Sequence, residues 1–165
     1  MKEIFERVSI RKYTDQTVEP EKVEKILRAA CAAPSAGNQQ PWEFFVIRDK
    51  AVIEELSHAH KYSDFVAGAG LVIVPCYRTE GLMFPEYDTI DTSLAVENML
   101  LEIQHLGLGT CFIGIAPEKI RIGRVAKAIN CPENLIPYTI LPIGYPAESR
   151  AQQDRYDESR IHYIG

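Results

Sequence analysis

The stretch Pro34-Ser35-Ala36-Gly37-Asn38-Gln39-Gln40-Pro41-Trp42 decides the fold, because it separates a clear helix from a clear strand. Before it, apolar residues from Pro20 to Ala32 recur at helical spacing, which predicts an amphipathic helix. Within it, Gly37 and Asn38 both tolerate a positive φ, so the helix stops there. After it, Trp42 to Ile47 is a short apolar and aromatic run, which predicts a strand buried on both faces.

Outward from this stretch, predicted helices and strands alternate along the chain. The helix after Ile90 is apolar around too much of its circumference for a surface helix, so we expect it in the middle of the assembly. Pro137 and Pro142 remove backbone donors, so their strand should lie at an edge or contain an irregularity. Alternation by itself predicts a doubly wound parallel sheet. The expected helices cover residues 2–8, 51–57, 91–106 and 117–129, and the further strands cover 71–77, 109–115 and 135–145.

The composition is that of an ordinary globular protein of 165 residues, so we expect one domain over residues 1–165. Lys and Arg number 18 against 23 Asp and Glu, and the net charge of −5 argues against a nucleic-acid partner. No apolar stretch approaches the roughly 18 residues of a membrane helix. Met1 to Arg7 is charged and has no apolar run, so we expect no signal or transit peptide and a cytoplasmic location.

Several common sites can be excluded by spacing. The four cysteines are at least 20 residues apart, so there is no Cys-x-x-Cys pair, and we expect reduced thiols in the core. The Gly107-Leu108-Gly109 segment is followed by Phe112 where a dinucleotide fingerprint requires glycine. No phosphate loop, nucleophile elbow or zinc-protease motif occurs, and we expect no metal site. The cysteines are Cys31, Cys76, Cys111 and Cys131.

The segment Arg7-Val8-Ser9-Ile10-Arg11 is the clearest candidate binding element. If it is extended, Arg7, Ser9 and Arg11 share one face while Val8 and Ile10 turn inward. Two guanidinium groups beside a hydroxyl suit a phosphate group. The alternative is a solvated face on which both arginines pair with nearby acidic residues, namely Glu3, Glu6 or Asp15.

The two segments together resemble the FMN-dependent nitroreductase family. That family opens with an Arg-Arg-Ser-x-Arg motif and continues with Ala-Pro-Ser-x-x-Asn-x-Gln-Pro-Trp running into the first strand. The chain carries both in order, and the resemblance extends through Gly107-Leu108-Gly109-Thr110 to Ile143-Gly144-Tyr145-Pro146-Ala147-Glu148. Two departures are Val8 in place of the second arginine, and a short segment, Arg78 to Ile90, where relatives often carry a longer insertion over the active site.

The resemblance implies FMN as cofactor, bound by residues of two subunits. It implies that one subunit binds the phosphate, ribityl chain and pyrimidine edge, with Arg11 near N1 and O2 of the flavin. It places a turn of the other subunit against the ring, and backbone amides after Phe112 near N5 and O4. Arg155 matches a phosphate-binding arginine, and Gln153 stands where a lysine is common. The implied cofactor-binding residues are Arg7, Val8, Ser9, Arg11, Pro34, Ser35, Ala36, Asn38, Ile113, Gly114 and Arg155.

The resemblance also implies the architecture. It replaces the parallel sheet with an α+β fold, in which helices flank a central, mainly antiparallel sheet. It implies an intertwined homodimer with C-terminal strand exchange, in which the tail 146–165 packs on the partner subunit. Residues Arg160 to Ile164 alternate apolar and polar, as an added edge strand would.

The implied activity is electron transfer from NAD(P)H, by a ping-pong mechanism, to nitroaromatic, quinone or related small-molecule acceptors. The flavin carries the chemistry, so no catalytic side chain is expected. Tyr62, Phe84 and Tyr87 are candidates for stacking over the ring. Two alternatives remain open: a flavin-binding carrier or sensor with little turnover, and a specialised enzyme of the same fold, such as a dehalogenase or a flavin-degrading enzyme.

Overall fold

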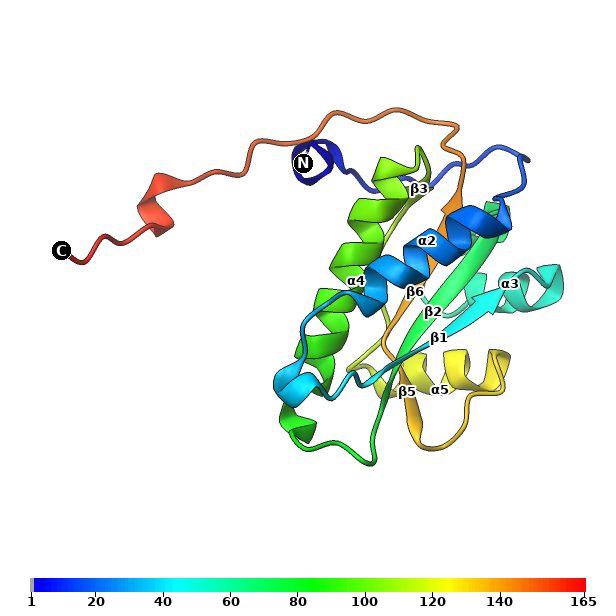
Figure 1. Cartoon of the computed structure of the whole chain (residues 1–165). Helices are drawn as coiled ribbons and strands as arrows, with labels where there is room; N and C mark the ends of the chain where they lie inside the picture. The colour runs from blue at the N-terminus through cyan, green and yellow to red at the C-terminus, as the bar shows by residue number, and fades with distance from the viewer. Residues whose placement is uncertain (1) are drawn as a thin grey trace.

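One antiparallel sheet with helices on both faces forms the body of the molecule (Figure 1). The computed structural model describes residues 2–165, so Met1 of the expected domain lies outside the described residues. The strands follow the order β1-β2-β6-β3, with β4 also paired to β6 and β5 to β2, and every strand pair is antiparallel. The α+β expectation is therefore confirmed, and the parallel sheet is wrong. The strands are β1 (Trp42–Ile47), β2 (Leu71–Arg78), β3 (Gly109–Thr110), β4 (Ile113–Gly114), β5 (Leu135–Pro137) and β6 (Thr139–Gly144).

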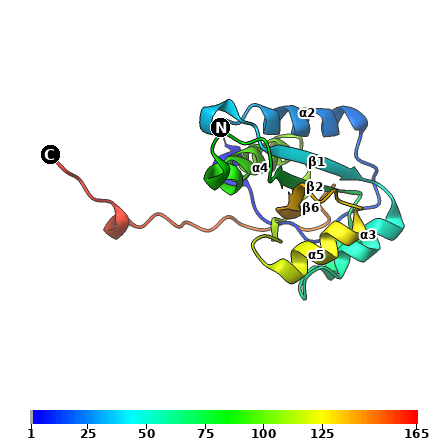
Figure 2. The same cartoon turned by 90° about the horizontal axis from the view of Figure 1, so that it is seen from below.

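Helices α2 and α4 cover one face of the sheet and α3 and α5 cover the other (Figure 2), while α1 packs against α4. The helices of the structure begin and end within three residues of the bounds predicted from the sequence, but the first helix is only a single turn. The helices are α1 (Glu3–Glu6), α2 (Pro20–Cys31), α3 (Lys50–Ser57), α4 (Asp88–His105) and α5 (Lys119–Ala128), with short 3-10 turns η1 (Ala36–Asn38), η2 (Asp64–Gly68), η3 (Pro85–Tyr87) and η4 (Glu158–Arg160).

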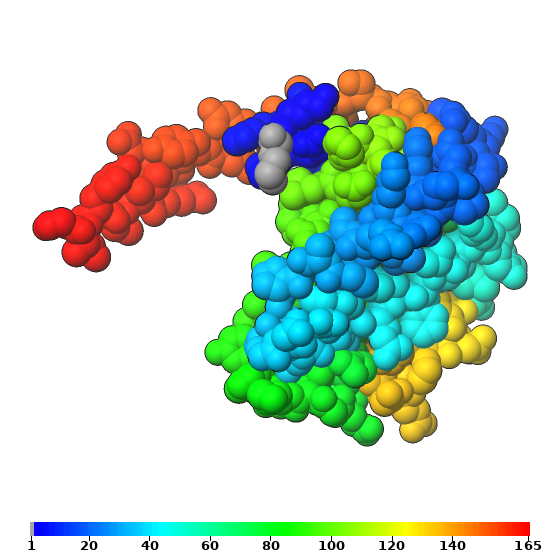
Figure 3. Space-filling model, in the orientation of Figure 1, coloured from blue at the N-terminus to red at the C-terminus, as the bar shows by residue number. Residues whose placement is uncertain are grey.

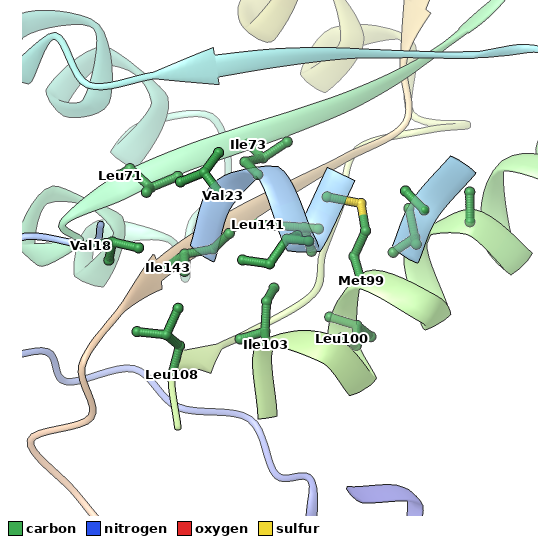
Figure 4. Close-up of a cluster of buried hydrophobic side chains, with 14 of the residues drawn as sticks. Val18, Val23, Leu71, Ile73, Met99, Leu100, Ile103, Leu108, Leu141 and Ile143 are labelled. Carbon is green, nitrogen blue, oxygen red and sulfur yellow. The ribbon is translucent and has the colours of Figure 1, made fainter. Parts of the chain in front are cut away.

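The larger core lies between one face of the sheet and the helices α2 and α4. Ile73 of β2, Leu141 of β6 and Met99 of α4 lie in this core (Figure 4). Ile26 of α2 belongs to the same cluster, and all four side chains are fully buried. Each such side chain contributes about 1.5–3 kcal/mol of burial free energy. This packing positions α4 along the sheet, with its outer face, including Leu94, exposed.

A second core covers the opposite face of the sheet. Val72 and Val74 alternate with the residues of the first core along β2, and they pack against α3, α5 and η2. Burial of β2 on both faces explains why its sequence is a continuous apolar run. The expectation of the same burial for β1 is wrong, since β1 pairs only with β2 and its Val46 is 41% exposed.

Two expected strands are each divided in two. Residues 109–115 form β3 and β4, and residues 135–145 form β5 and β6, with Tyr138 between them. The amide of Tyr138 donates to the carbonyl of Pro75, so the chain stays attached to β2 across the break. The irregularity predicted from the prolines is confirmed, but β6 is a central strand rather than an edge.

Beyond Gln152 the tail leaves the body of the molecule and projects into solvent (Figure 3). It contains only the turn η4, and within residues 2–165 no strand pairs with Arg160 to Ile164. Tyr163 is 85% exposed and Ile164 fully exposed. The exchange of this segment with a second chain stays a prediction.

The cysteines do not all lie in the core. Cys76 and Cys111 are buried and Cys131 is partly buried, but Cys31 is exposed at the end of α2, so its expected burial is wrong. All four are free thiols. In the described part of the chain, no helix combines the length and the apolar character that crossing a membrane requires.

Candidate functional site

The segment from Arg7 to Arg11 is extended and runs beside β3. Ser9 forms a parallel bridge with Thr110, and the amide of Ile10 donates to the Thr110 carbonyl at 2.9 Å. Ile10 is buried, and its Cβ lies 2.7 Å from the point that a Cβ on Gly109 would occupy, so only glycine permits this approach. The alternation that puts Ile10 inward leaves Arg11 exposed, while Arg7, Val8 and Ser9 are half-buried.

Neither arginine of this segment forms an ion pair with a carboxylate of the described residues. Among the ion pairs within residues 2–165, none includes Arg7 or Arg11. Glu3, the first acidic neighbour expected to pair with them, instead contacts His105 at 2.9 Å. The guanidinium of Arg11 lies 5.8 Å from the centre of the Phe65 ring, which orients it without neutralising its charge.

Glu148 fixes the backbone of this segment from the start of the tail. Its carboxylate accepts a hydrogen bond of 2.6 Å from the amide of Arg11 and a contact of 3.3 Å from Arg150. The Arg11 amide, and then Arg150, hold the pKa of the Glu148 carboxyl below its ordinary value. Tyr13, two residues on, donates its hydroxyl to the Ile10 carbonyl at 2.7 Å, and burial raises the pKa of that hydroxyl.

The tail brings Arg155 to the same end of the molecule. Gln152 donates its side-chain amide to the carbonyl of Arg7 at 2.7 Å. The guanidinium of Arg155 then lies 3.4 Å from the Gln152 side-chain oxygen. A groove of about 490 Å³ separates this part of the tail from Ile4 and Phe5 of α1. Arg7, Ser9 and Arg11 thus lie on one extended segment, and Arg155 follows in the part of the tail that Gln152 anchors to it; we call these four residues the cationic edge.

The turn from Pro34 to Asn38 is held in shape by its own side chains. Gly37 and Asn38 have φ values of 54° and 55°, as the sequence predicted for this turn. The Ser35 hydroxyl accepts the amide of Gln40 at 3.0 Å, and the Gln40 side chain donates to Asn38 at 2.9 Å. Pro34 and Asn38 are exposed, while Ser35 and Ala36 are half-buried.

Two residues from other elements tie this turn to the body. Asp91 of α4 accepts the Ala36 amide at 3.0 Å. Arg78 at the end of β2 donates to the carbonyls of Gln39 and Gln40 at 2.9 and 3.0 Å. These contacts fix the turn, including η1, against the body of the molecule.

Ile113 and Gly114 form β4, which pairs with β6. The buried Thr139 hydroxyl donates to the Ile113 carbonyl at 2.8 Å, and Arg121 donates to the Gly114 carbonyl at 3.2 Å. A Cβ on Gly114 would meet only the Phe112 ring, at 3.8 Å. The backbone here is open to approach, as expected for a segment that contacts a flat ligand.

One chain does not bring these groups together. The turn of Pro34 to Asn38 is bonded to Asp91 in the first turn of α4, whereas the groove beside Val8 is lined by Gln104 and Gly107 at its other end. Because 13 residues of α4 separate Asp91 from Gln104, about 20 Å of helix lies between them. Figure 1 shows the two groups at opposite ends of this helix. A single ligand cannot contact both within one chain.

Sequence reasoning missed several residues that shape this site. Asp91 is 2% exposed, and a carboxylate among apolar residues at helical spacing was the available clue. Gln39, Glu148 and Gln152 carry no such pattern, because their partners lie between 45 and 145 residues away. Within residues 2–165, no group of three or more acidic, histidine or cysteine side chains could hold a metal ion.

Comparison with known proteins gives a consistent result over the whole chain. A model of the nitroreductase family matches residues 4–61 and 53–145. A candidate NADH dehydrogenase/NAD(P)H nitroreductase of Methanothermobacter thermautotrophicus is 37% identical over 156 residues, which are 94% of this chain and 82% of the relative.

Solved structures extend the likeness to three dimensions. An FMN-dependent nitroreductase of Clostridium difficile has a TM-score of 0.91 and 30% identity, over 99% of this chain and 98% of that one. A candidate nitroreductase of Desulfovibrio desulfuricans, solved in complex with FMN, has a TM-score of 0.86 and 30% identity, over 99% and 95%. An iodotyrosine deiodinase of Nematostella vectensis is 26% identical over 181 residues, which are 89% of this chain and 67% of that protein.

Proposed function

Because the chain belongs to the nitroreductase family, we propose that it is an FMN-dependent enzyme that transfers electrons from NAD(P)H to nitroaromatic, quinone or related acceptors. Several relatives, including the Methanothermobacter protein, are named as NAD(P)H-dependent oxidoreductases. The cationic edge is the observation that carries the choice of FMN, because free cations on an ordered backbone are what a phosphate group requires.

The donor set of the cationic edge fits the flavin. Arg7 and Ser9 would hold the phosphate and the ribityl chain, and Arg155 would add a third polar contact. Arg11 would lie at the pyrimidine edge, where a cation stabilises the negative charge of a reduced flavin. Val8 supplies packing in place of a further cation. The Glu148 carboxylate and the Phe65 ring orient Arg11 for this role.

The second half of the site would come from another copy of the chain. Pro34, Ser35, Ala36 and Asn38 would line the ring of a flavin held by the partner, and the backbone of Ile113 and Gly114 would face its polar edge. When bound, FMN supplies two-electron transfer, taking a hydride from NAD(P)H and releasing the electrons to the acceptor in a ping-pong sequence. The protein would bind and orient the flavin and exclude water from its ring.

A homodimer also explains the apolar surface of the single chain. Ile90 and Leu94 near the start of α4 are 53% and 43% exposed, and Phe5 of α1, near the other end of α4, is 76% exposed, and a second subunit would cover such side chains. In Figure 1 the tail runs past α1 and then projects away from the body. We propose that the tail 146–165 packs on the partner and that Arg160 to Ile164 adds to its sheet.

The test is the visible absorbance and kinetics of the purified protein. We expect a yellow protein with a flavin spectrum that oxidises NAD(P)H only when an acceptor is present. Double-reciprocal plots at several acceptor concentrations should give parallel lines, as a ping-pong mechanism requires. Colourless protein that takes up no added FMN and oxidises no NAD(P)H would exclude this function.

A second candidate is reductive dehalogenation, which the likeness to an iodotyrosine deiodinase favours. Its distinguishing result would be halide release from a halogenated tyrosine at a rate above that of nitroaromatic reduction. A carrier or sensor with little turnover, which Val8 and the short segment from Arg78 to Ile90 suggested, would bind FMN without NAD(P)H oxidation above the rate of free flavin.

A further inference from the structure

The segment between β2 and α4, residues 79–87, forms a short aromatic strap at the end of the molecule that carries the turn Pro34 to Asn38. Its rings are only partly covered: Phe84 is 38% and Tyr87 43% exposed. They meet edge to face, with centroids 6.4 Å apart and planes at 85°. The strap includes η3 but no longer element, so its shape depends on contacts with neighbouring parts of the chain.

One side chain, Gln39, makes two of the hydrogen bonds that hold the strap, and Thr79 makes two more with the carbonyl of Asn134. The amide oxygen of Gln39 accepts the backbone amide of Phe84 at 2.9 Å, and its amide nitrogen donates to the carbonyl of the same residue at 3.0 Å. Gln39 thus pairs with Phe84 as a strand residue would pair with its neighbour. The second hydrogen of the Gln39 nitrogen is directed to Asp91 at 2.8 Å.

Asp91 fixes the other side of Gln39. Its carboxylate is 2% exposed and accepts two hydrogen bonds, one from Gln39 and one from the amide of Ala36. A buried carboxylate is costly unless such donors surround it, so the loop and the helix keep a fixed relation. Gln39 and Asp91 together connect the turn, the strap and the first turn of α4.

The Phe84 ring packs directly against the turn. A Cβ on Gly37 would lie 2.8 Å from Cε2 of Phe84, which is too short for a contact between two carbon atoms. The absence of a side chain at Gly37 therefore makes room for the ring, in addition to permitting its φ of 54°. The result is an aromatic surface beside the turn, held by polar contacts that do not themselves face a ligand.

We propose that Gln39 and Asp91 are positioning residues that hold the strap so that Phe84 and Tyr87 form an aromatic wall selecting flat aromatic acceptors. The inference rests on the proposed function, in which the adjoining turn lines a flavin ring. A half-exposed aromatic pair offers stacking and edge contacts to a planar ring, and such contacts need a fixed geometry. A small inorganic acceptor gains nothing from the wall.

The test replaces Gln39 by Leu, which keeps the approximate volume and removes all three hydrogen bonds. Menadione serves as the planar acceptor and ferricyanide as the non-stacking acceptor. We expect the ratio of the menadione KM to the ferricyanide KM to rise about tenfold, the scale of one lost oriented contact. Chymotrypsin should also cleave after Tyr87 faster in the variant, because the strap is released.

The matched control is Gln16→Leu, the same chemical change at an exposed loop position away from the strap. It should keep wild-type values in both measurements. A Gln39→Leu protein with an unchanged KM ratio and unchanged cleavage would overturn the inference. If that variant does not fold, Asp91→Asn, which keeps the volume but replaces one acceptor oxygen by a donor, should change both measurements in the same direction, and its failure to do so would also overturn it.

The two proposals fail in distinguishable ways. Wild-type protein without flavin or NAD(P)H oxidation contradicts the proposed function and, with it, the selection of acceptors. Wild-type protein that is active, with an unaltered KM ratio in Gln39→Leu, contradicts the positioning role alone. In the double variant Gln39→Leu with Asp91→Ala, the KM ratio should be no higher than in the more affected single variant, because the two residues act as one unit.

Discussion

Arg7 and Ser9 distinguish a binding strand from an ordinary charged surface. Neither side chain is needed to hold the segment in place, since the backbone pairs with Thr110 and Ile10 is the buried anchor. The polar groups are therefore free to serve a ligand. Replacing them tests binding with little effect on folding.

The double change Arg7→Ala with Ser9→Ala should weaken FMN binding by about 2 to 4 kcal/mol, the value of the lost hydrogen bonds to a charged group. Isothermal titration of the flavin-free protein measures the change in Kd. Arg124→Ala, which removes an exposed cation on α5, is the control and should leave the Kd unchanged. Equal affinities in all three proteins would show that the cationic edge does not hold the phosphate.

Two buried threonines should respond oppositely to the same substitution. The Thr110 hydroxyl is buried and has no hydrogen-bond partner among residues 2–165, whereas the Thr139 hydroxyl donates to Ile113 at 2.8 Å. Thr110→Val should raise stability by about 1 kcal/mol and Thr139→Val should lower it by about 1–2 kcal/mol. Thermal unfolding should shift by about 2–4 °C per kcal/mol. Destabilisation by both changes would contradict this account of Thr110.

The residues that sequence predicted correctly are those whose structural requirement is local. Gly37 and Asn38 need a positive φ, and both stand in a recognisable cluster of turn residues. Gln39 and Asp91 act through partners brought together by the fold, and no spacing rule identifies such pairs. The expected inward position of Val8 was only half right, since the groove beside it stays open.

At the scale of elements, one polar cluster joins the start of α2 to the end of α4. The Tyr145 hydroxyl accepts from Lys22 at 2.6 Å and donates to Glu19 at 2.8 Å. Lys22 also donates to the Leu106 carbonyl at 3.2 Å, just beyond α4. The cluster therefore fixes the two helices that cover the larger core.

Tyr145→Phe should destabilise the fold by about 1–2 kcal/mol near neutral pH, because two hydrogen bonds are lost. The Tyr145 hydroxyl, and then Glu19, raise the pKa of Lys22 above 10.5, while the backbone amide of Glu19 and then Tyr145 lower the pKa of the Glu19 carboxyl below 4.5. The contribution of Glu19 is complete above pH 4.5 and is lost as the pH falls through its folded value. That of Lys22 is complete below pH 10.5 and is lost as the pH rises through its folded value.

The difference in melting temperature between wild type and Tyr145→Phe should thus be largest between these limits and shrink in acid and in strong base. Calorimetry over this pH range measures it. A difference that stays constant into acid would mean that the Glu19 contact contributes nothing.

The limits of element prediction also have physical causes. Helices α2 to α5 were found because their apolar spacing and end signals are local. The strand breaks at Cys111-Phe112 and at Tyr138 depend on which neighbours each segment pairs with, so the sequence indicated an irregularity but not its position. The position of β1 at the sheet edge depends on strand order, which periodicity does not encode.

At the scale of the whole molecule, the tail is an extended segment that does not pack on the core of its own chain. Its last anchor on its own chain before the polar turn is Gln152, which is bonded to Arg7. Such a segment is stable in an extended form only when another surface receives it. The proposed homodimer supplies that surface.

Removing residues 153–165 should convert a species of twice 18.6 kDa into a monomer and abolish FMN retention. Light scattering after gel filtration measures the mass. Full-length Arg155→Ala separates the two effects, because it removes the cation but keeps the arm, and it should remain a dimer with weakened flavin binding. A truncated protein that remains dimeric would show that the arm does not hold the subunits together.

The placement of the cationic edge and the turn Pro34 to Asn38 at opposite ends of α4 has a genetic consequence. If each flavin binds the cationic edge of one subunit and the turn of the other, a dimer has two sites. Each chain then supplies its cationic edge to one site and its turn to the other. Two chains damaged in different halves would then form a mixed dimer with one site doubly damaged and one intact. Coexpression of two inactive alleles would restore activity to a cell that neither allele supports by itself.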